Sequence, residues 1–173
     1  MKSYLKVLIL IVLAPVNFVI AENNKPHSFG MSITSGNYDQ SSGNGNVTVN
    51  TFEYQYDFSD NWSVEARLGK GTSKTVISGG FSETIEISSI KGLYFIRHYD
   101  KNEEFHWYTL IGGTTIEEKT FFYTSNESRM ALGFGVENKV EDNVNIKFGY
   151  TQYMLTNRGT NYGGLEIGVK YRF

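Results

Sequence analysis

The final segment of the 173-residue chain alternates strictly between apolar and other side chains. Every second residue from Leu165 to Phe173 is apolar. The residues between them are Glu166, Gly168, Lys170 and Arg172. A period of two places these two sets on opposite faces of a β-strand. Free chain ends of soluble domains usually fray, so an apolar stripe that reaches the last residue favours a strand held in a closed barrel. If the apolar face meets lipid, the charged face lines a polar interior, as in a transmembrane β-barrel.

The composition agrees with an all-β protein. Aromatic residues make up 15% of the chain, there are 18 glycines and no cysteine, and the only prolines are Pro15 and Pro26. No segment after residue 21 has the 3.6-residue period of an amphipathic helix. Because cysteine is absent, something other than disulfides must hold an exported chain together.

The first 21 residues have the features of a secretory signal peptide. Two lysines precede an apolar run over residues 7–14, and small residues precede Glu22. We expect a cleaved signal peptide at 1–21 and one barrel domain at 22–173. A membrane anchor is the alternative, but Pro15 and Asn17 leave the apolar run short of the roughly 20 residues that span a bilayer. The remaining chain has 14 basic and 18 acidic residues, a net charge of −4 that does not suggest a nucleic-acid partner.

Eight segments show strand-like alternation. They cover residues 27–35, 46–58, 62–73, 84–99, 105–117, 128–139, 144–155 and 162–173. Short polar links at 59–61, 100–104 and 140–143 alternate with longer links at 36–45, 74–83, 118–127 and 156–161. Outer-membrane barrels have short periplasmic turns and longer extracellular loops. The sequence therefore predicts an eight-stranded antiparallel up-and-down transmembrane β-barrel with periplasmic termini. The facing of 84–99 and 105–117 stays open because both faces carry apolar residues.

Charged residues are expected inside this barrel. The predicted lumen charge network consists of Glu53, Glu65, Arg67, Glu137, Lys147, Glu166, Lys170 and Arg172. Eight strands enclose a space that side chains just fill. Isolated buried charges are costly, so acidic and basic groups there should pair. A structural plug is the favoured interpretation, and a gated ion path is the alternative.

Aromatic residues are expected to form a girdle at each end of the barrel. The predicted periplasmic girdle contains Trp62, Tyr99, Phe105, Trp107, Tyr171 and Phe173. The predicted opposite girdle contains Phe81, Phe121, Phe122, Tyr123 and Tyr162. Exposed aromatics can also mark a contact site, so Phe121, Phe122 and Tyr123 are a candidate surface contact. Burial of the same side chains in the lipid headgroup layer is equally compatible with the pattern.

Catalytic and metal-binding residues are not expected. Hydrolysis or acyl transfer on the outer leaflet needs a nucleophile activated by a base. His27, His98 and His106 all fall at predicted periplasmic strand ends, where interfacial packing is the favoured role. No acidic and histidine residues have metal-ligand spacing, although Glu103, Glu104 and His106 could bind a cation weakly. No cofactor is predicted.

The eight segments, the link from Tyr56 to Trp62 and the ending Tyr171-Arg172-Phe173 resemble the small outer-membrane barrels of the OmpX and OmpA-transmembrane type. The resemblance covers residues 22–173. It implies fold and location, and members of this group range from structural proteins to adhesins and serum-resistance factors. It also implies that Tyr171 and Phe173 belong to the terminal signal read by the barrel-assembly machinery. The chain differs from the OmpA pattern because it lacks a C-terminal peptidoglycan-binding domain.

We therefore expect a structural or surface-contact (adhesin-like) protein of a Gram-negative outer membrane. Its expected partners are outer-membrane lipid, lipopolysaccharide and the assembly machinery, with an unknown host or cell-surface ligand and a monomeric state. A narrow porin-like channel and a lipid A-modifying enzyme are alternatives. Another alternative is a soluble lipocalin-like carrier with its apolar stripe inside. The chain lacks the disulfide, the helix after the strands and the polar chain end usual in such carriers.

Overall fold

The computed structural model describes residues 26–40, 43–71, 74–78, 81–101, 103–119, 124–153 and 161–173. The predicted signal peptide and the predicted contact residues Phe121, Phe122 and Tyr123 lie outside these ranges. The strands are β1 (His27–Gln40), β2 (Gly43–Ser59), β3 (Trp62–Gly71), β4 (Lys74–Ser78), β5 (Phe81–Tyr99), β6 (Phe105–Lys119), β7 (Thr124–Glu141), β8 (Val144–Tyr153) and β9 (Asn161–Arg172). Within these ranges, no helix is long and apolar enough to cross a membrane.

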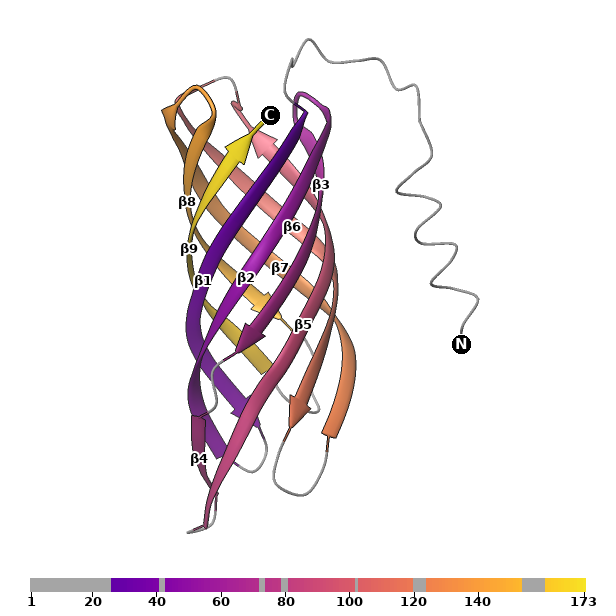
Figure 1. Cartoon of the computed structure of the whole chain (residues 1–173), viewed down its shortest axis with the longest axis vertical. Coiled ribbons are helices and arrows are strands. Elements are labelled where there is room, and N and C mark those ends of the chain that lie inside the picture. Colours follow the sequence, from indigo (N-terminus) through magenta and orange to yellow (C-terminus); the bar gives the residue numbers. More distant parts are fainter. Residues whose placement is uncertain are drawn as a thin grey trace, which may run out of the picture.

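The strands form a closed antiparallel barrel (Figure 1). Their order is β3-β2-β1-β9-β8-β7-β6-β5-β4, and an additional pairing of β3 with β5 closes the ring. β3 pairs with the Ile90–Arg97 part of β5, whereas β4 pairs with its Phe81–Ile85 part. β3 and β4 thus share one position in the ring, which gives the predicted eight-stranded barrel. We call the end with the C-terminus and the short turns the turn end, and the opposite end the loop end.

The first and last strands seal the barrel. They pair from Ser28 with Arg172 to Asp39 with Asn161, and the Phe173 N–H donates to the His27 carbonyl at 2.9 Å. Near the loop end this seam requires glycine, because a Cβ atom on Gly36 would lie 1.9 Å from the Gly163 carbonyl oxygen. Closure leaves no unpaired edge along this part of the sheet.

The strands continue into segments where the sequence analysis expected links. β1 runs to Gln40 and β2 begins at Gly43, within the predicted link 36–45. β4 and the start of β5 form a hairpin within the predicted link 74–83. These segments lack apolar alternation, but backbone pairing with the neighbouring strand does not require it. β5 has 19 residues, whereas a tilted strand crosses a bilayer with about 9 to 11.

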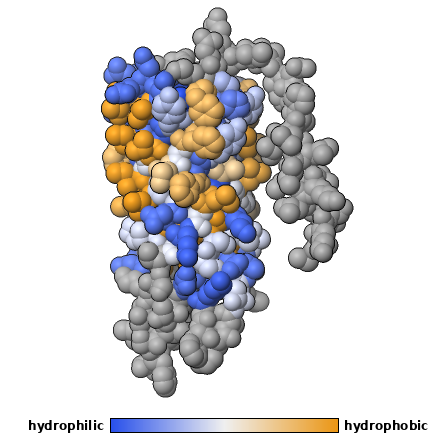
Figure 2. Space-filling view, in the orientation of Figure 1, coloured by the Kyte–Doolittle hydropathy of each residue, from blue (hydrophilic) through white to orange (hydrophobic). Residues whose placement is uncertain are grey.

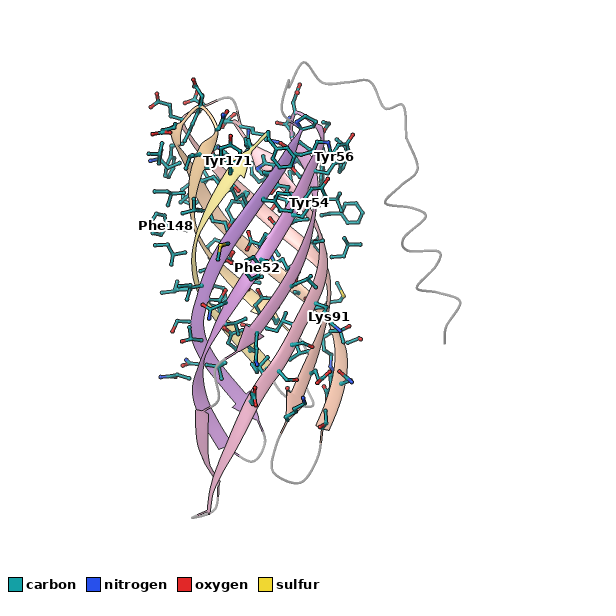
Figure 3. All side chains as sticks on the ribbon, in the orientation of Figure 1. Phe52, Tyr54, Tyr56, Lys91, Phe148 and Tyr171 are labelled. Atoms are coloured by element: carbon teal, nitrogen blue, oxygen red, sulfur yellow. The ribbon has the colours of Figure 1, made fainter. Side chains whose placement is uncertain are left out.

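An apolar belt covers the outer face of the half nearer the turn end (Figure 2). Its members are outward-facing, with Phe148 as one example in Figure 3. They are Phe29, Met31, Ile33, Phe52, Leu68, Phe95, Ile111, Met130, Leu132, Phe134, Phe148, Leu165, Ile167 and Val169. The predicted girdle residues Trp62, Tyr99, Phe105, Trp107, Tyr171 and Phe173 are also exposed. The apolar stripe thus faces outward, unlike that of a lipocalin-like carrier.

The belt ends at a ring of polar or small outward-facing residues, one from each position around the barrel. This polar ring consists of Ser35, Asn50, Lys70, Lys91, Thr115, Ser128, Gln152 and Gly163. Neighbouring members pair directly in places, as Lys91 does with Thr115 and Thr115 with Ser128. Lys91 lies closer to the loop end than the aromatic residues labelled in Figure 3. The barrel therefore extends past its apolar belt.

The structure settles the facing that the sequence left open. Phe95 and Ile111 point outward, whereas Tyr94, His98 and Tyr108 are buried inside. One predicted girdle residue is corrected: Tyr162 is fully buried and stacks on Tyr153 inside the barrel. Its position on β9 has the same parity as Glu166, so it shares the inward face. The remaining predicted members of that girdle, Phe81 by its side chain and residues 121–123, lie outside the described part.

Candidate functional site

Ion pairs span the interior at the level of the apolar belt. Arg67 on β3 donates through Nη1 to Glu166 Oε2 on β9 at 2.9 Å. Lys147 on β8 contacts Glu53 Oε2 on β2 at 2.5 Å and also contacts Glu166. All four side chains are buried. Strands from opposite sides of the ring are thus joined through the lumen.

A second group of pairs continues the network toward the turn end. Lys170 Nζ lies 2.6 Å from Glu137 Oε1 and 3.1 Å from Glu65 Oε2, and it donates to Gln55 Oε1 at 2.6 Å. Glu65 also accepts from Arg67 Nε at 2.5 Å, which connects both groups. Removing one member of a buried ion pair leaves the charge of the other uncompensated, which typically costs about 3 to 5 kcal/mol. The interior is therefore a mutually dependent set of charges.

Arg172 is the predicted network member that the structure does not bring into these pairs. Its side chain is half-buried at the turn end, and its Nη2 has no hydrogen-bond partner among the described residues. The other predicted members, Glu53, Glu65, Arg67, Glu137, Lys147, Glu166 and Lys170, meet in the lumen.

Toward the loop end the interior becomes apolar, which the sequence analysis did not expect. On β2, Val47 and Val49 face inside while Asn46 and Asn50 face outside. From Phe52 onward the same strand has apolar residues outside and polar residues inside. The buried apolar group of this section includes Val47, Val49, Ile87, Ile90 and Ile116. The part beyond the belt therefore has a polar exterior and a largely apolar interior, in which Glu118 is also buried, as in a water-exposed barrel.

Tyrosines fill the space between the two sections. The Arg67 guanidinium lies 4.9 Å from the centre of the Tyr94 ring, and Tyr94 Oη is 2.5 Å from Thr114 Oγ1. The Tyr108 ring lies over Gly135 and Gly149, where added Cβ atoms would come within 2.6 Å and 2.5 Å of its hydroxyl. Large rings accommodated by glycines leave a packed interior rather than an open tube.

A buried cluster closes the turn end, and the sequence analysis missed its lysine. Asp100 adopts a left-handed backbone with φ of 56°, and the following Lys101 is buried with its Nζ 2.7 Å from Asp57 Oδ2. Burial lowers the pKa of Lys101, and the Asp57 carboxylate opposes this shift. The sequence placed Lys101 in a polar turn, because nothing in the local pattern shows that the turn folds over the barrel mouth.

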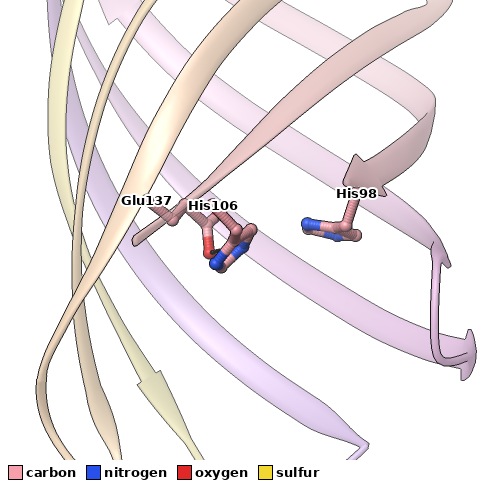
Figure 4. Close-up of side chains that lie close together, drawn as sticks. All are labelled: His98, His106 and Glu137. Atoms are coloured by element: carbon pink, nitrogen blue, oxygen red, sulfur yellow. Dashed lines mark ion pairs between the residues drawn. The ribbon is translucent and has the colours of Figure 1, made fainter. Parts of the chain in front are cut away.

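Two of the three histidines lie inside the barrel, which corrects the expectation of interfacial packing. His98 and His106 are 1% and 2% exposed, and their ring centres are 5.4 Å apart. His106 pairs across strands with Glu137, and its Nε2 lies 3.6 Å from Glu137 Oε2 (Figure 4). Glu103 and Glu104, which the sequence grouped with His106, are exposed. The expectation was wrong because the sequence left the facing of the strands that carry His98 and His106 open. His27 remains at the rim, stacked on Phe173.

Ser63 and His98 form the hydroxyl–imidazole contact at this end, but the order of contacts differs from that of a catalytic triad. Ser63 Oγ lies 2.8 Å from His98 Nε2 and donates to Asp57 Oδ1 at 2.6 Å. In a triad the carboxylate orients the histidine, which then takes the serine proton. Here the carboxylate contacts the serine, and Ser63 is fully buried. This arrangement fixes the His98 ring rather than exposing a nucleophile.

The family follows from comparison with known proteins. Residues 7–173 match the model of the outer membrane protein beta-barrel domain family. The chain belongs to this family, whose members are β-barrels of the outer membrane. No curated protein matches the sequence.

Solved structures with the same fold are outer-membrane barrels of distant sequence. The attachment invasion locus protein Ail of Yersinia pestis, in complex with the heparin analogue sucrose octasulfate, is 18% identical with a TM-score of 0.60, covering 85% of this chain and 97% of that one. Neisserial surface protein A is 14% identical with a TM-score of 0.69, covering 86% and 97%. OprG from Pseudomonas aeruginosa is 12% identical with a TM-score of 0.56, covering 89% and 99%. At such identities the likeness concerns the fold alone.

Proposed function

We propose that this protein is a non-catalytic surface-contact protein of the Gram-negative outer membrane, which acts through its loop end. The observation that carries the proposal is the closed interior beneath a water-exposed barrel extension. In the described part of the barrel, paired charges and tyrosines occupy the lumen, which supports a closed interior rather than a path for a solute. The part of the barrel available for recognition is then the section beyond the polar ring.

The chemistry of that section suits a polar contact surface. Its outward ion pairs join Lys70 with Glu86 and Lys119 with Glu117, at 3.7 and 3.6 Å. Exposed pairs of this kind add little stability. They give the outer surface of this section both positive and negative charges. The rigid sheet holds any contacting side chain in a defined position, as recognition requires.

The lengths of the connections support an orientation for this proposal. The termini and short turns lie in the periplasm, and the loop end faces the outside, because outer-membrane barrels have this asymmetry. Lys70 and Lys91 then lie at the outer edge of the belt, where they can meet lipopolysaccharide phosphates. The protein works as a monomer inserted by the barrel-assembly machinery.

The β4–β5 hairpin allows a direct test. Because β3 pairs with Ile90–Arg97 and not with the hairpin, removing residues 74–85 leaves the closing pairing intact. Cells displaying the native chain, the hairpin deletion, or a chain with Phe121, Phe122 and Tyr123 changed to serine would be compared for adhesion. The surfaces would be epithelial monolayers and heparin-coated plates, the latter because Ail was solved with a heparin analogue. A glycine-serine insertion between Asp142 and Asn143, at the turn end, is the matched control.

Adhesion by native cells that falls in either loop-end variant, but not in the control, supports the proposal. Surface display is checked in each case by labelling of an epitope tag. Equal adhesion of all displayed variants, or of cells without the protein, contradicts it.

A further inference from the structure

We infer that His98, His106 and Glu137 form a binding site for a late first-row divalent metal ion, with Zn²⁺ as the preferred probe, inside the turn end of the barrel. The three residues come from the neighbouring strands β5, β6 and β7 and converge in the lumen (Figure 4). One potential ligand atom from each lies within 4.8 Å of the others. All three side chains are buried.

The hydrogen bonds of His98 assign its tautomer. Ser63 has one hydroxyl proton, and it donates that proton to Asp57 Oδ1 at 2.6 Å. The 2.8 Å contact between Ser63 Oγ and His98 Nε2 must therefore use a proton on Nε2. Nδ1 then carries the lone pair, and none of the described residues gives it a hydrogen-bond partner. Metal-binding histidines usually have their other nitrogen held in this way.

His106 presents a stronger anomaly. Neither of its ring nitrogens has a hydrogen-bond partner within the described part of the chain, although the residue is 2% exposed. The 3.6 Å separation between its Nε2 and Glu137 Oε2 is longer than a hydrogen bond. Buried polar atoms are nearly always satisfied, so an imidazole without partners requires an explanation. A metal ion between Nε2 and the carboxylate supplies one.

Glu137 has an oxygen available for this role. Its Oε1 is held by Lys170 at 2.6 Å, whereas Oε2 faces His106 and accepts from Asn145 at 3.2 Å. The interior pairs also contain one more carboxylate than cations: Glu53, Glu65, Glu137 and Glu166 meet Arg67, Lys147 and Lys170. A bound cation offsets this excess of negative charge.

The donor set selects the metal. Two imidazoles and one carboxylate suit Zn²⁺, Co²⁺, Ni²⁺ or Cu²⁺, whereas Mg²⁺ and Ca²⁺ prefer oxygen donors. Tetrahedral Zn²⁺ places its ligand atoms about 3.3 Å apart. The 3.6 Å pair already approaches this spacing, and the ligand atom of His98 lies within 4.8 Å of the other two. The exposed Glu103 and Glu104 at the same mouth would attract cations toward it.

Metal titration of the folded, full mature barrel tests the inference. Protein refolded in detergent and stripped with a chelator would be titrated with Co²⁺ and Zn²⁺, and bound metal measured after dialysis. We expect one ion per chain, visible absorption bands of four-coordinate Co²⁺, and their loss when Zn²⁺ displaces it. His98→Gln and His106→Gln should weaken binding at least about ten-fold. His27→Gln is the matched control at the same end, and it should bind like the native chain.

The native spectrum keeps the test independent of how any variant folds. Absence of four-coordinate Co²⁺ bands and of stoichiometric Zn²⁺ in the folded native chain overturns the inference. Binding that survives in folded His98→Gln and His106→Gln chains overturns it too, since the metal would then lie elsewhere.

Discussion

Arg67 and Glu166 lie 99 residues apart in the sequence and meet at 2.9 Å inside the barrel. Their strands, β3 and β9, are not neighbours in the sheet, so the contact crosses the lumen. Lys147, on a third strand, contacts Glu166, and it also contacts Glu53, which lies on a fourth strand. The Arg67–Glu166 and Lys147–Glu53 pairs thus join strands that are not adjacent in the sheet.

Removing two interacting charges from this network should cost less than the sum of the two single losses. Lys170→Gln leaves Glu137 and Glu65 without their shared cation and should destabilise the fold by about 3 to 5 kcal/mol. In Glu137→Gln/Lys170→Gln the loss should be smaller than the sum of the two single losses, because the two residues interact. Urea unfolding in detergent micelles measures both values. Additive losses would show that the two side chains act independently.

The belt predicts where a charge is tolerated on the outer face. Ile167→Arg, between Ile33 and Phe148, should destabilise the inserted barrel by about 2 to 4 kcal/mol. Ser35→Arg points outward as well, but it lies in the polar ring and should cost about 0 to 1 kcal/mol. The free energy of unfolding from lipid vesicles, measured for both variants, distinguishes the two positions. Equal costs would mean that the polar ring does not mark the edge of the lipid.

Deletion of Phe173 should separate stability from assembly. The ring stacks on Phe29 with centres 5.5 Å apart, and its loss should cost at most about 1 to 3 kcal/mol. The truncated chain should therefore refold in detergent and still change gel mobility on boiling. In cells, outer-membrane insertion should fall sharply if Phe173 belongs to the assembly signal. Mild and equal losses in refolding and in membrane fractionation would reduce Phe173 to a packing residue.

The sequence predicted the part of the barrel that lies in the membrane. Alternation at Phe52, Tyr54 and Tyr56, and again at Ile167 and Val169, assigns strands and facing because lipid demands an unbroken apolar stripe outside. This is why the eight-stranded fold and the inward side of Glu53 and Lys170 follow from local pattern alone.

Beyond the belt the same reasoning fails. At Val47 and Val49 the apolar residues change face, so the alternation weakens across the change, and the predicted strand 46–58 starts three residues later than β2 does. On β5 a register shift between Ile87 and Ser89 also breaks the period. These strands are stabilised by contact with water on the outer face and by packing on the inner face. Neither produces the sequence pattern that is expected of strands in lipid.

The histidine cluster was missed for a different reason. His98 and His106 lie on strands with apolar residues on both faces, and Glu137 is on the next strand. Their proximity depends on the register of His106 with Glu137, which no local spacing contains. Lys101 was missed because the fold of its turn depends on the distant Asp57.

Single-channel recording tests the closed interior most directly. Purified, folded monomer would be added to planar lipid bilayers, with insertion verified by protease protection in parallel vesicles. Because paired charges and tyrosines occupy the lumen, the account predicts no reproducible conductance steps. Stable nanosiemens steps from the monomer would contradict the closed interior and support a channel.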